Sequence, residues 1–130
     1  MNVKILLVED DKNSQLTIYR LLKSNNLNYV SYVSFAENGK EAIELVESQK
    51  FSLILMNIQM PIMDGLKATK KIREILGYEN IPIIAVTALA MSGDRKKCLE
   101  AGATDYLPKP IDSKEFLDMV NFYINKEIQA

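Results

Sequence analysis

Five short apolar runs alternate along the chain with segments in which apolar residues recur every three or four positions. The runs have the length of buried strands and lie at 4–8, 29–35, 53–56, 82–86 and 106–107. The second run is rich in β-branched and aromatic residues, which fit a pleated sheet. Because strands and helices alternate with short connections, the pattern predicts an α/β fold in which a parallel sheet carries helices on both faces.

Polar caps, glycines and apolar spacing predict helices between and after these runs. The chain has no linker, repeat or low-complexity stretch, so we expect a single domain over residues 1–130. The first expected helix begins at Asn13 or Ser14 with Ile18, Leu21 and Leu22 inward, and the second spans 39–49. The third carries Ala68, Ile72, Ile75 and Leu76 and ends at Gly77. The fourth runs from Ser92-Gly93-Asp94 to about Ala101, and the fifth begins at Asp112 or Ser113 with Leu117, Val120 and Ile124 inward.

Composition narrows the possible partners and chemistry. The net charge is -1 and the basic residues are scattered, which favours neither a nucleic-acid surface nor a membrane surface. No apolar run approaches the roughly 18 to 20 residues that cross a bilayer, and the N-terminus has no signal-peptide pattern, so a cytoplasmic location is expected. The absence of histidine excludes histidine-activated nucleophiles and histidine zinc sites, and the single cysteine, Cys98, cannot form an internal disulfide.

Polar residues follow four of the predicted strands. Glu9 and Asp10 come after the first run, Asn57 after the third, Thr87 after the fourth and Lys109 after the fifth. In an open parallel sheet the carboxyl ends of the strands share one edge, where ligands bind. Two carboxylates suit Mg²⁺, and a hydroxyl with a lysine suits phosphoryl oxygens. Each residue alone is more often structural, but together they predict a pocket for a small phosphoryl group.

The same segments resemble the receiver domain of bacterial two-component response regulators, the family that includes chemotaxis regulators. The likeness covers nearly the whole chain, and it implies a flavodoxin-like sheet of five strands in the order 2-1-3-4-5 with a signalling rather than an enzymatic role. Four segments carry it in order: Ile5-Leu-Leu-Val-Glu-Asp-Asp11, Leu53-Ile-Leu-Met-Asn-Ile-Gln-Met-Pro-Ile-Met-Asp-Gly65, Ile84-Ala-Val-Thr-Ala88 and Tyr106-Leu-Pro-Lys-Pro110.

The resemblance implies a role for each matching position. Glu9 and Asp10 match the acidic pair that holds Mg²⁺, with Asp10 the more direct ligand, and the backbone carbonyl of Gln59 matches the main-chain ligand. Thr87 matches the hydroxyl that follows the phosphoryl group, and Tyr106 matches the switch aromatic. Lys109 matches the lysine that pairs with a phosphoryl oxygen. In the family the peptide bond at Lys109-Pro110 is often cis.

Asn57 departs from the family pattern at the position of the phosphoacceptor aspartate. An amide is a poor nucleophile, so the chain is expected not to accept phosphate by the usual route and to rest in the inactive state. Loss of the negative charge is also expected to weaken Mg²⁺ binding at this position and to let Lys109 pair with Asp10. Asn57 is either natural or a substitution that traps the unphosphorylated state, and the retention of Asp10, Thr87 and Lys109 favours a recent or deliberate change.

Three hypotheses about function follow. The first is a receiver that meets a sensor histidine kinase or phosphotransfer protein beside its first helix, and an effector through its fourth helix, fifth strand and fifth helix. The second is an interaction module that works without phosphate. The third, a phosphohydrolase or flavin carrier on a similar sheet, is disfavoured because Asn57 removes the nucleophile and because Glu9-Asp10-Asp11 would repel an anionic cofactor.

Overall fold

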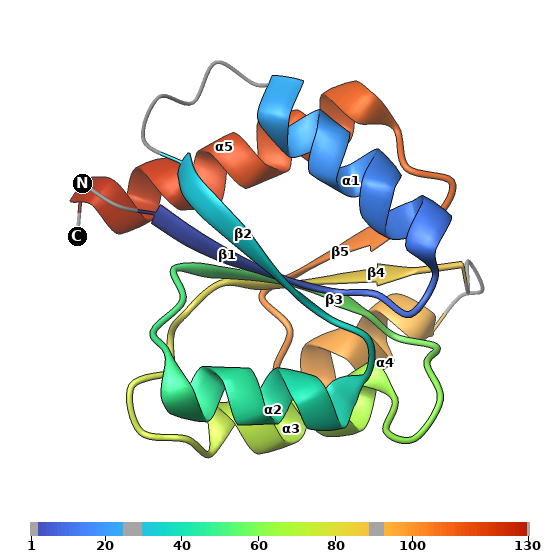
Figure 1. Ribbon diagram of the computed structural model, residues 1–130. Helices are drawn as coiled ribbons and strands as arrows, with labels where there is room; N and C mark the ends of the chain where they lie inside the picture. The colour runs from blue at the N-terminus through green and yellow to red at the C-terminus, as the bar shows by residue number, and fades with distance from the viewer. Residues whose placement is uncertain (1–2, 25–29, 89–92, 130) are drawn as a thin grey trace.

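The computed structural model describes residues 3–24, 30–88 and 93–129, and these residues form a three-layer α/β fold (Figure 1). Its five strands pair in parallel in the order β2-β1-β3-β4-β5, which confirms the predicted topology. The elements are β1 (Val3–Val8), α1 (Lys12–Ser24), β2 (Val30–Ala36), α2 (Gly39–Ser48), β3 (Leu53–Asn57), α3 (Gly65–Arg73), β4 (Ile83–Thr87), α4 (Asp94–Glu100), β5 (Asp105–Pro108) and α5 (Ser113–Gln129).

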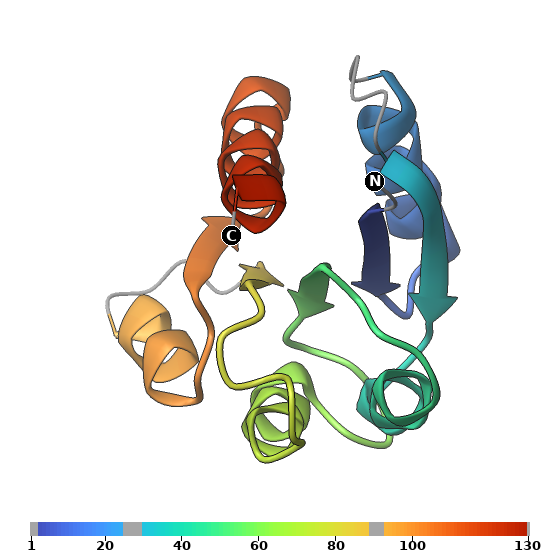
Figure 2. The ribbon, with the colours of Figure 1, turned by 90° about the vertical axis from the view of Figure 1, so that its left-hand side faces the viewer.

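Helices cover both faces of the sheet. Helices α1 and α5 lie on one face and α2, α3 and α4 on the other, as the end-on view shows (Figure 2). Successive side chains of a strand point to opposite faces, so β3 sends Leu53 and Leu55 into the first layer and Ile54 and Met56 into the second. All four are fully buried, and burial of each stabilises the fold by about 2 kcal/mol. This double burial explains why the strands read as continuous apolar runs.

The start of α1 differs from the prediction. Neither Asn13 nor Ser14 caps the helix; instead Asp11 Oδ2 accepts a hydrogen bond from the backbone N–H of Ser14 at 2.8 Å. The Asp11 carbonyl also accepts from the backbone N–H of Gln15 at 2.9 Å. Asp11 is therefore the cap, because a carboxylate satisfies the free N–H groups of the first turn more strongly than an amide or a hydroxyl.

The end of α3 is also earlier than predicted. The helix ends at Arg73 rather than near Gly77, and Leu76, which was expected on its apolar face, is 92% exposed. The N–H groups of Glu74 and Ile75 turn to the carbonyls three residues back, which tightens the last turn. Arg73 then bonds to loops at the start of β4 and β5, so tertiary contacts end the helix before the apolar spacing does.

The other predicted elements agree with the structure within one or two residues. Strand β5 is longer than the predicted pair 106–107, and α4 ends at Glu100. Asp112 caps α5 through the N–H of Glu115, and Leu117 is only partly buried, while Phe116 takes the buried position beside Val120 and Ile124. Tyr29 and Ser92 lie outside the described residues. None of the described helices has the length and apolarity that a membrane crossing requires.

Candidate functional site

Glu9 is a buried carboxylate at the carboxyl end of β1, with 1% of its surface exposed. Its Oε1 accepts from Lys109 Nζ at 2.8 Å, and its Oε2 accepts from the backbone N–H of Asp11 at 3.0 Å. Its backbone is held as well, because its N–H donates to the carbonyl of Ala36 at 2.9 Å. A charge this deep in the protein requires such partners, since burial without them is costly.

Asn57 is the last residue of β3 and is 6% exposed. Its amide Nδ2 lies 3.0 Å from Asp10 Oδ1, 3.0 Å from the backbone oxygen of Gln59 and 3.3 Å from Glu9 Oε2. An amide nitrogen carries two hydrogens, so these three oxygens share two donors. We name Glu9, Asp10, Asn57, the Gln59 carbonyl and Lys109 the polar cup.

Lys109 reaches the cup from the carboxyl end of β5, and the Lys109-Pro110 peptide bond is cis as expected. The expected pairing with Asp10 is wrong: Lys109 Nζ bonds Glu9 instead, at 2.8 Å. The physical reason is burial. Asp10 is exposed and can be solvated, whereas the Glu9 carboxylate is 1% exposed and requires a cation close by.

Thr87 and Tyr106 differ in how close they come to the cup. Thr87 is 1% exposed at the end of β4, and its carbonyl accepts from the backbone N–H of Lys109 at 2.8 Å. Tyr106 pairs in register with Ala85, two positions before Thr87, and packs against the α2–α4 layer of the core. Burial raises the pKa of its hydroxyl, with Cys98 and Asp94 adding to the shift. Thr87 is therefore joined to the cup through the backbone of Lys109, whereas Tyr106 packs against the core.

Two residues that support the cup were not predicted. Gln15 is buried on α1, and its Nε2 donates to the Glu9 carbonyl at 2.6 Å. Asp11 caps α1 and directs its N–H to Glu9, and hydrogen bonds from Ser14 lower the pKa of the Asp11 carboxyl. The sequence does contain a signal for Gln15, because it shares the helix face of Ile18 and Leu22, where a polar residue is out of place.

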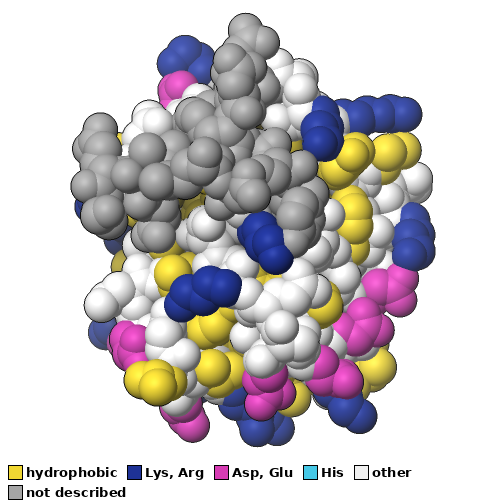
Figure 3. All heavy atoms as spheres, turned by 60° about the vertical axis from the view of Figure 1, so that its left-hand side comes forward, with side chains coloured by type: hydrophobic (Ala, Val, Ile, Leu, Met, Phe, Trp, Pro, Cys, Tyr) yellow, Lys and Arg dark blue, Asp and Glu magenta, His cyan; other side chains and the backbone are white. Residues whose placement is uncertain are grey.

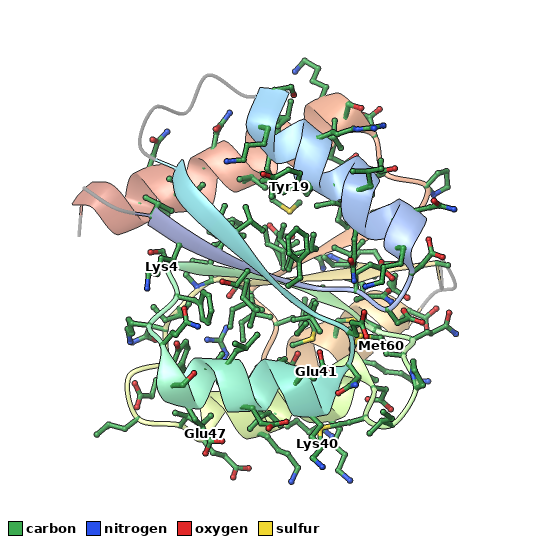
Figure 4. All side chains as sticks on the ribbon, viewed as in Figure 1. Lys4, Tyr19, Lys40, Glu41, Glu47 and Met60 are labelled. Atoms are coloured by element: carbon green, nitrogen blue, oxygen red, sulfur yellow. The ribbon has the colours of Figure 1, made fainter. Side chains whose placement is uncertain are left out.

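The loop after β3 is pressed against Asn57 by Gly65. A Cβ at this position would lie 2.2 Å from the Asn57 carbonyl oxygen, so only glycine fits. The Gly65 N–H donates to the Ile58 carbonyl at 2.8 Å, and Asp64 caps α3 through the N–H of Lys67 at 2.9 Å. In Figure 4 Met60 marks this loop at the edge of the molecule where the cup lies. The Gly65 contact fixes the position of Asn57 relative to the loop carbonyl of Gln59.

The donor set of the cup fits Mg²⁺. The oxygens of Glu9, Asp10 and Gln59 converge on the point now held by Asn57 Nδ2, and hard cations prefer carboxylate and carbonyl oxygens. Over residues 3–24, 30–88 and 93–129 no group of three or more His, Cys, Asp or Glu side chains could hold a metal. An ion bound here would therefore depend on the backbone carbonyl and on water as well as on the two acids.

Comparisons with known proteins agree with this geometry. The family model of the response regulator receiver domain matches residues 5–121. The chain is 42% identical over 133 residues to hybrid signal transduction histidine kinase I of Dictyostelium discoideum, covering 97% of this chain and 7% of that protein. It is 37% identical over 119 residues to the signal transduction histidine-protein kinase BarA of Escherichia coli, covering 92% of this chain and 12% of that protein. The chain thus spans a small part of these curated relatives.

A solved structure is similar over the full fold. The receiver domain of the sensor histidine kinase PA1611 of Pseudomonas aeruginosa superposes with a TM-score of 0.84 at 38% identity, covering 96% of this chain and 99% of that one. That crystal structure has a magnesium ion coordinated in its active site cleft.

Proposed function

The chain belongs to the response regulator receiver domain family, and from this premise we propose that it is a receiver module that Asn57 keeps unphosphorylated and in the inactive arrangement. The observation that carries the proposal is the position of Asn57 at the centre of the polar cup, with its amide bonded to three oxygens. In an active receiver that position presents a carboxylate oxygen, which attacks phosphorus. The amide nitrogen of Asn57 has its lone pair delocalised and is not a nucleophile.

Residues Glu9, Asp10 and the Gln59 carbonyl are those that would hold Mg²⁺, which when bound neutralises the charge of phosphoryl oxygens. Asn57 weakens this site in two ways. First, it lacks the negative charge of an aspartate. Two opposite unit charges about 4 Å apart attract by on the order of 4 kcal/mol at an effective dielectric near 20, before solvation offsets part of this energy. Its amide must also rotate to present Oδ1, giving up the hydrogen bonds from Nδ2 to the three oxygens.

The remaining site residues have roles in binding and switching in this proposal. On phosphorylation, Lys109 would leave Glu9 to pair with a phosphoryl oxygen, and the Thr87 hydroxyl would donate to the phosphoryl group. Tyr106 would then change its conformation and pass the effect to α4. Such a change is a shift between two existing arrangements. The chain itself catalyses no turnover, and it acts in the cytoplasm.

The proposal also places the surfaces on which partner proteins would dock. A hollow of about 320 Å³ lies between the start of α1 and the loop after β5, lined by Ser14, Thr17, Lys109 and Pro110 among others. It borders the cup and is where a histidine kinase or phosphotransfer protein would dock. The effector surface in this proposal is the face formed by α4, β5 and α5. The relatives named above are themselves histidine kinases.

An interaction module that works without phosphate is the second candidate, and one observation favours it. Asn57 Nδ2 satisfies oxygens of Glu9, Asp10 and Gln59 that would otherwise need a cation, so the cup is stable without one. In that case Asn57→Asp leaves partner binding unchanged, whereas in the first proposal it makes binding depend on phosphorylation.

Intact mass spectrometry after incubation with Mg²⁺ and a small phosphodonor tests the proposal. We expect no phosphoryl adduct on the chain and one adduct on Asn57→Asp. Asn57→Ala is the matched control, because it removes the amide without supplying a nucleophile, and it should stay unmodified. A stable adduct on the unaltered chain, at any residue of the cup, would refute the claim that the site does not accept phosphate.

A further inference from the structure

The chain concentrates negative charge in one turn, Glu9-Asp10-Asp11, which joins β1 to α1 and contributes two side chains to the polar cup. We name these three residues the acidic turn. On the side of the molecule where β1 begins, which faces the viewer in Figure 3, lysine and arginine side chains lie among acidic and hydrophobic ones. In the acidic turn the neighbours have the same sign and repel one another. The direction of each of its carboxylates must therefore be set by other groups.

Asp10 is exposed, unlike Glu9, the other carboxylate of the cup. Packing therefore does not fix its side chain. Its Oδ1 nevertheless lies 3.0 Å from Asn57 Nδ2 at the centre of the cup. An aspartate side chain has only two rotatable bonds, so the place of its carboxylate depends largely on the backbone torsions of the residue. The backbone on either side of Asp10 is thus what aims it.

Hydrogen bonds with side chains hold both peptide groups that flank Asp10. The group before it contains the Glu9 carbonyl, which accepts from Gln15 Nε2 at 2.6 Å. The group after it contains the Asp11 N–H, which donates to Glu9 Oε2 at 3.0 Å. A peptide group is planar, so a bond to one of its atoms orients the whole group. Rotation about both backbone bonds of Asp10 is therefore restrained.

Gln15 is itself held firmly on α1. It is 8% exposed and lies on the same helix face as the buried Leu22. Its backbone N–H donates to the Asp11 carbonyl at 2.9 Å, so its main chain and its side chain bond on opposite sides of Asp10. A buried amide costs free energy unless it is hydrogen-bonded, and an apolar side chain would pack here without that cost. What the amide supplies, and an apolar side chain of equal length cannot, is the donor for the Glu9 carbonyl.

We infer that Gln15 is a positioning residue for the metal site: it holds the peptide group between Glu9 and Asp10 and thereby aims the Asp10 carboxylate at the centre of the polar cup. Since the cup is taken here as a Mg²⁺ site, this role of Gln15 rests on the proposed function and deepens it. Mg²⁺ demands near-octahedral geometry, whereas Ca²⁺ tolerates longer and less regular bonds. Gln15 therefore sets the preference of the cup for Mg²⁺ over Ca²⁺ as well as its affinity, in the way that residues behind a ligand tune a metal site.

The first test uses the chain as it is, without metal. In a ¹⁵N-labelled sample the side-chain amide of Asn57 gives its own pair of resonances, which respond to the oxygens that accept its hydrogens. Gln15→Met keeps the length of the side chain without branching and removes the donor. Because Asp10 is then able to turn away from Asn57 Nδ2, we expect these resonances to shift and their hydrogens to exchange faster with solvent.

The second test measures cation binding in the Asn57→Asp background, where the cup has a third carboxylate. Mg²⁺ and Ca²⁺ are titrated separately, and binding is followed by the backbone amide shifts of the acidic turn. Adding Gln15→Met should weaken Mg²⁺ binding by about tenfold, as loss of a residue that orients a metal ligand does. Ca²⁺ binding should weaken by about threefold at most, because that cation adapts to a displaced ligand. The ratio of the two affinities is a readout that a loss of stability alone would not change.

Leu22→Val is the matched control, since it trims a buried side chain two turns further along the same face of α1. It should lower the melting temperature as Gln15→Met does, and leave the Asn57 resonances and the ratio of cation affinities unchanged. Equal weakening of both cations, unaltered Asn57 resonances in Gln15→Met, or the same changes in Leu22→Val would each overturn the positioning role. Failure of Asn57→Asp to bind Mg²⁺ would instead overturn the proposed function, and the resonances of the parent chain would then decide the role of Gln15 alone.

Discussion

The polar side chains at the two ends of the sheet are bonded in different ways. At the amino end, Arg73 and Tyr78 bond mainly to backbone carbonyl and N–H groups. At the carboxyl end, Glu9, Asn57 and Lys109 bond largely to one another. A backbone partner cannot be exchanged without moving the chain, whereas a side-chain partner can be replaced by an ion or a ligand. The difference separates residues that hold the fold from residues that are available for chemistry.

Arg73 shows the first kind of bonding most clearly. Its Nε donates to the Gly102 carbonyl at 2.8 Å, and its Nη1 donates to the carbonyls of Tyr78 and Ile81 at 2.8 and 2.6 Å. Its Nη2 reaches Thr104 Oγ1 at 2.9 Å. Burial lowers the pKa of this guanidinium. One side chain thus ties the end of α3 to the loops that lead into β4 and β5.

Arg73→Ala is expected to cause the largest loss in the free energy of unfolding, about 3 kcal/mol, because three carbonyls lose their donor together. Urea denaturation followed by circular dichroism measures it. Arg73→Lys is the matched control, since it keeps the charge but not the planar fork, and should recover only part of the loss. An alanine variant as stable as the parent would show that these bonds do not hold the amino end.

Asn57→Asp tests the carboxyl end of the sheet, where the polar side chains bond largely to one another. The new carboxylate lies beside Asp10 Oδ1 and Glu9 Oε2, where the amide now donates, so without metal we expect a loss of about 2 kcal/mol. Added Mg²⁺ should restore the loss, since ligand binding to the native state stabilises it in proportion to the logarithm of its concentration. Thermal melts with and without Mg²⁺ measure both.

The parent chain is the control for this prediction. Its melting temperature should respond little to Mg²⁺, because Asn57 already satisfies the oxygens of the cup. A parent chain stabilised by Mg²⁺ as strongly as Asn57→Asp would contradict the account of the cup given above.

Tyr78→Phe removes fewer hydrogen bonds at the amino end of the sheet than Arg73→Ala does. The hydroxyl donates to the Gln49 carbonyl at 2.8 Å and accepts from the N–H of Phe51 at 3.1 Å, which joins the loop before β3 to the loop before β4. Because the ring stays in place, we expect a loss of about 1 kcal/mol in urea denaturation. A loss as large as that of Arg73→Ala would mean that the ring position also depends on the hydroxyl.

The smallest expected effect is the pH dependence of Asp11 at the carboxyl end. Hydrogen bonds from Ser14 lower its pKa, so its contribution to stability is present above the ordinary aspartate pKa and is lost as the pH falls through the lower, folded value. The melting temperature of Asp11→Asn should therefore lie below that of the parent near pH 7 and converge with it in strong acid. A constant difference between the two at all pH values would show that the carboxylate charge plays no part.

Local pattern was sufficient for most of the fold and for the place of the site. Continuous apolar runs predicted strands buried on both faces, and polar residues at their carboxyl ends predicted where the cup lies. Asn57 was also placed by its position alone, because the last residue of a parallel strand lies at the carboxyl edge of the sheet. Gln15 could have been predicted, since it interrupts an apolar helix face.

What the sequence by itself determined, then, is which segments are strands and helices and which chemical groups gather at one edge. Only the tertiary structure decided how those groups pair and where some helices end. Lys109 bonds Glu9, a hundred residues away, because burial makes that carboxylate the one in need of a cation. Helix α3 ends at Arg73, although Ile75 and Leu76 continue its apolar spacing. It ends there because the Arg73 guanidinium donates hydrogen bonds to carbonyls in the loops that lead into β4 and β5. Periodicity is a property of neighbours in the chain, whereas burial and pairing depend on residues that are distant in it.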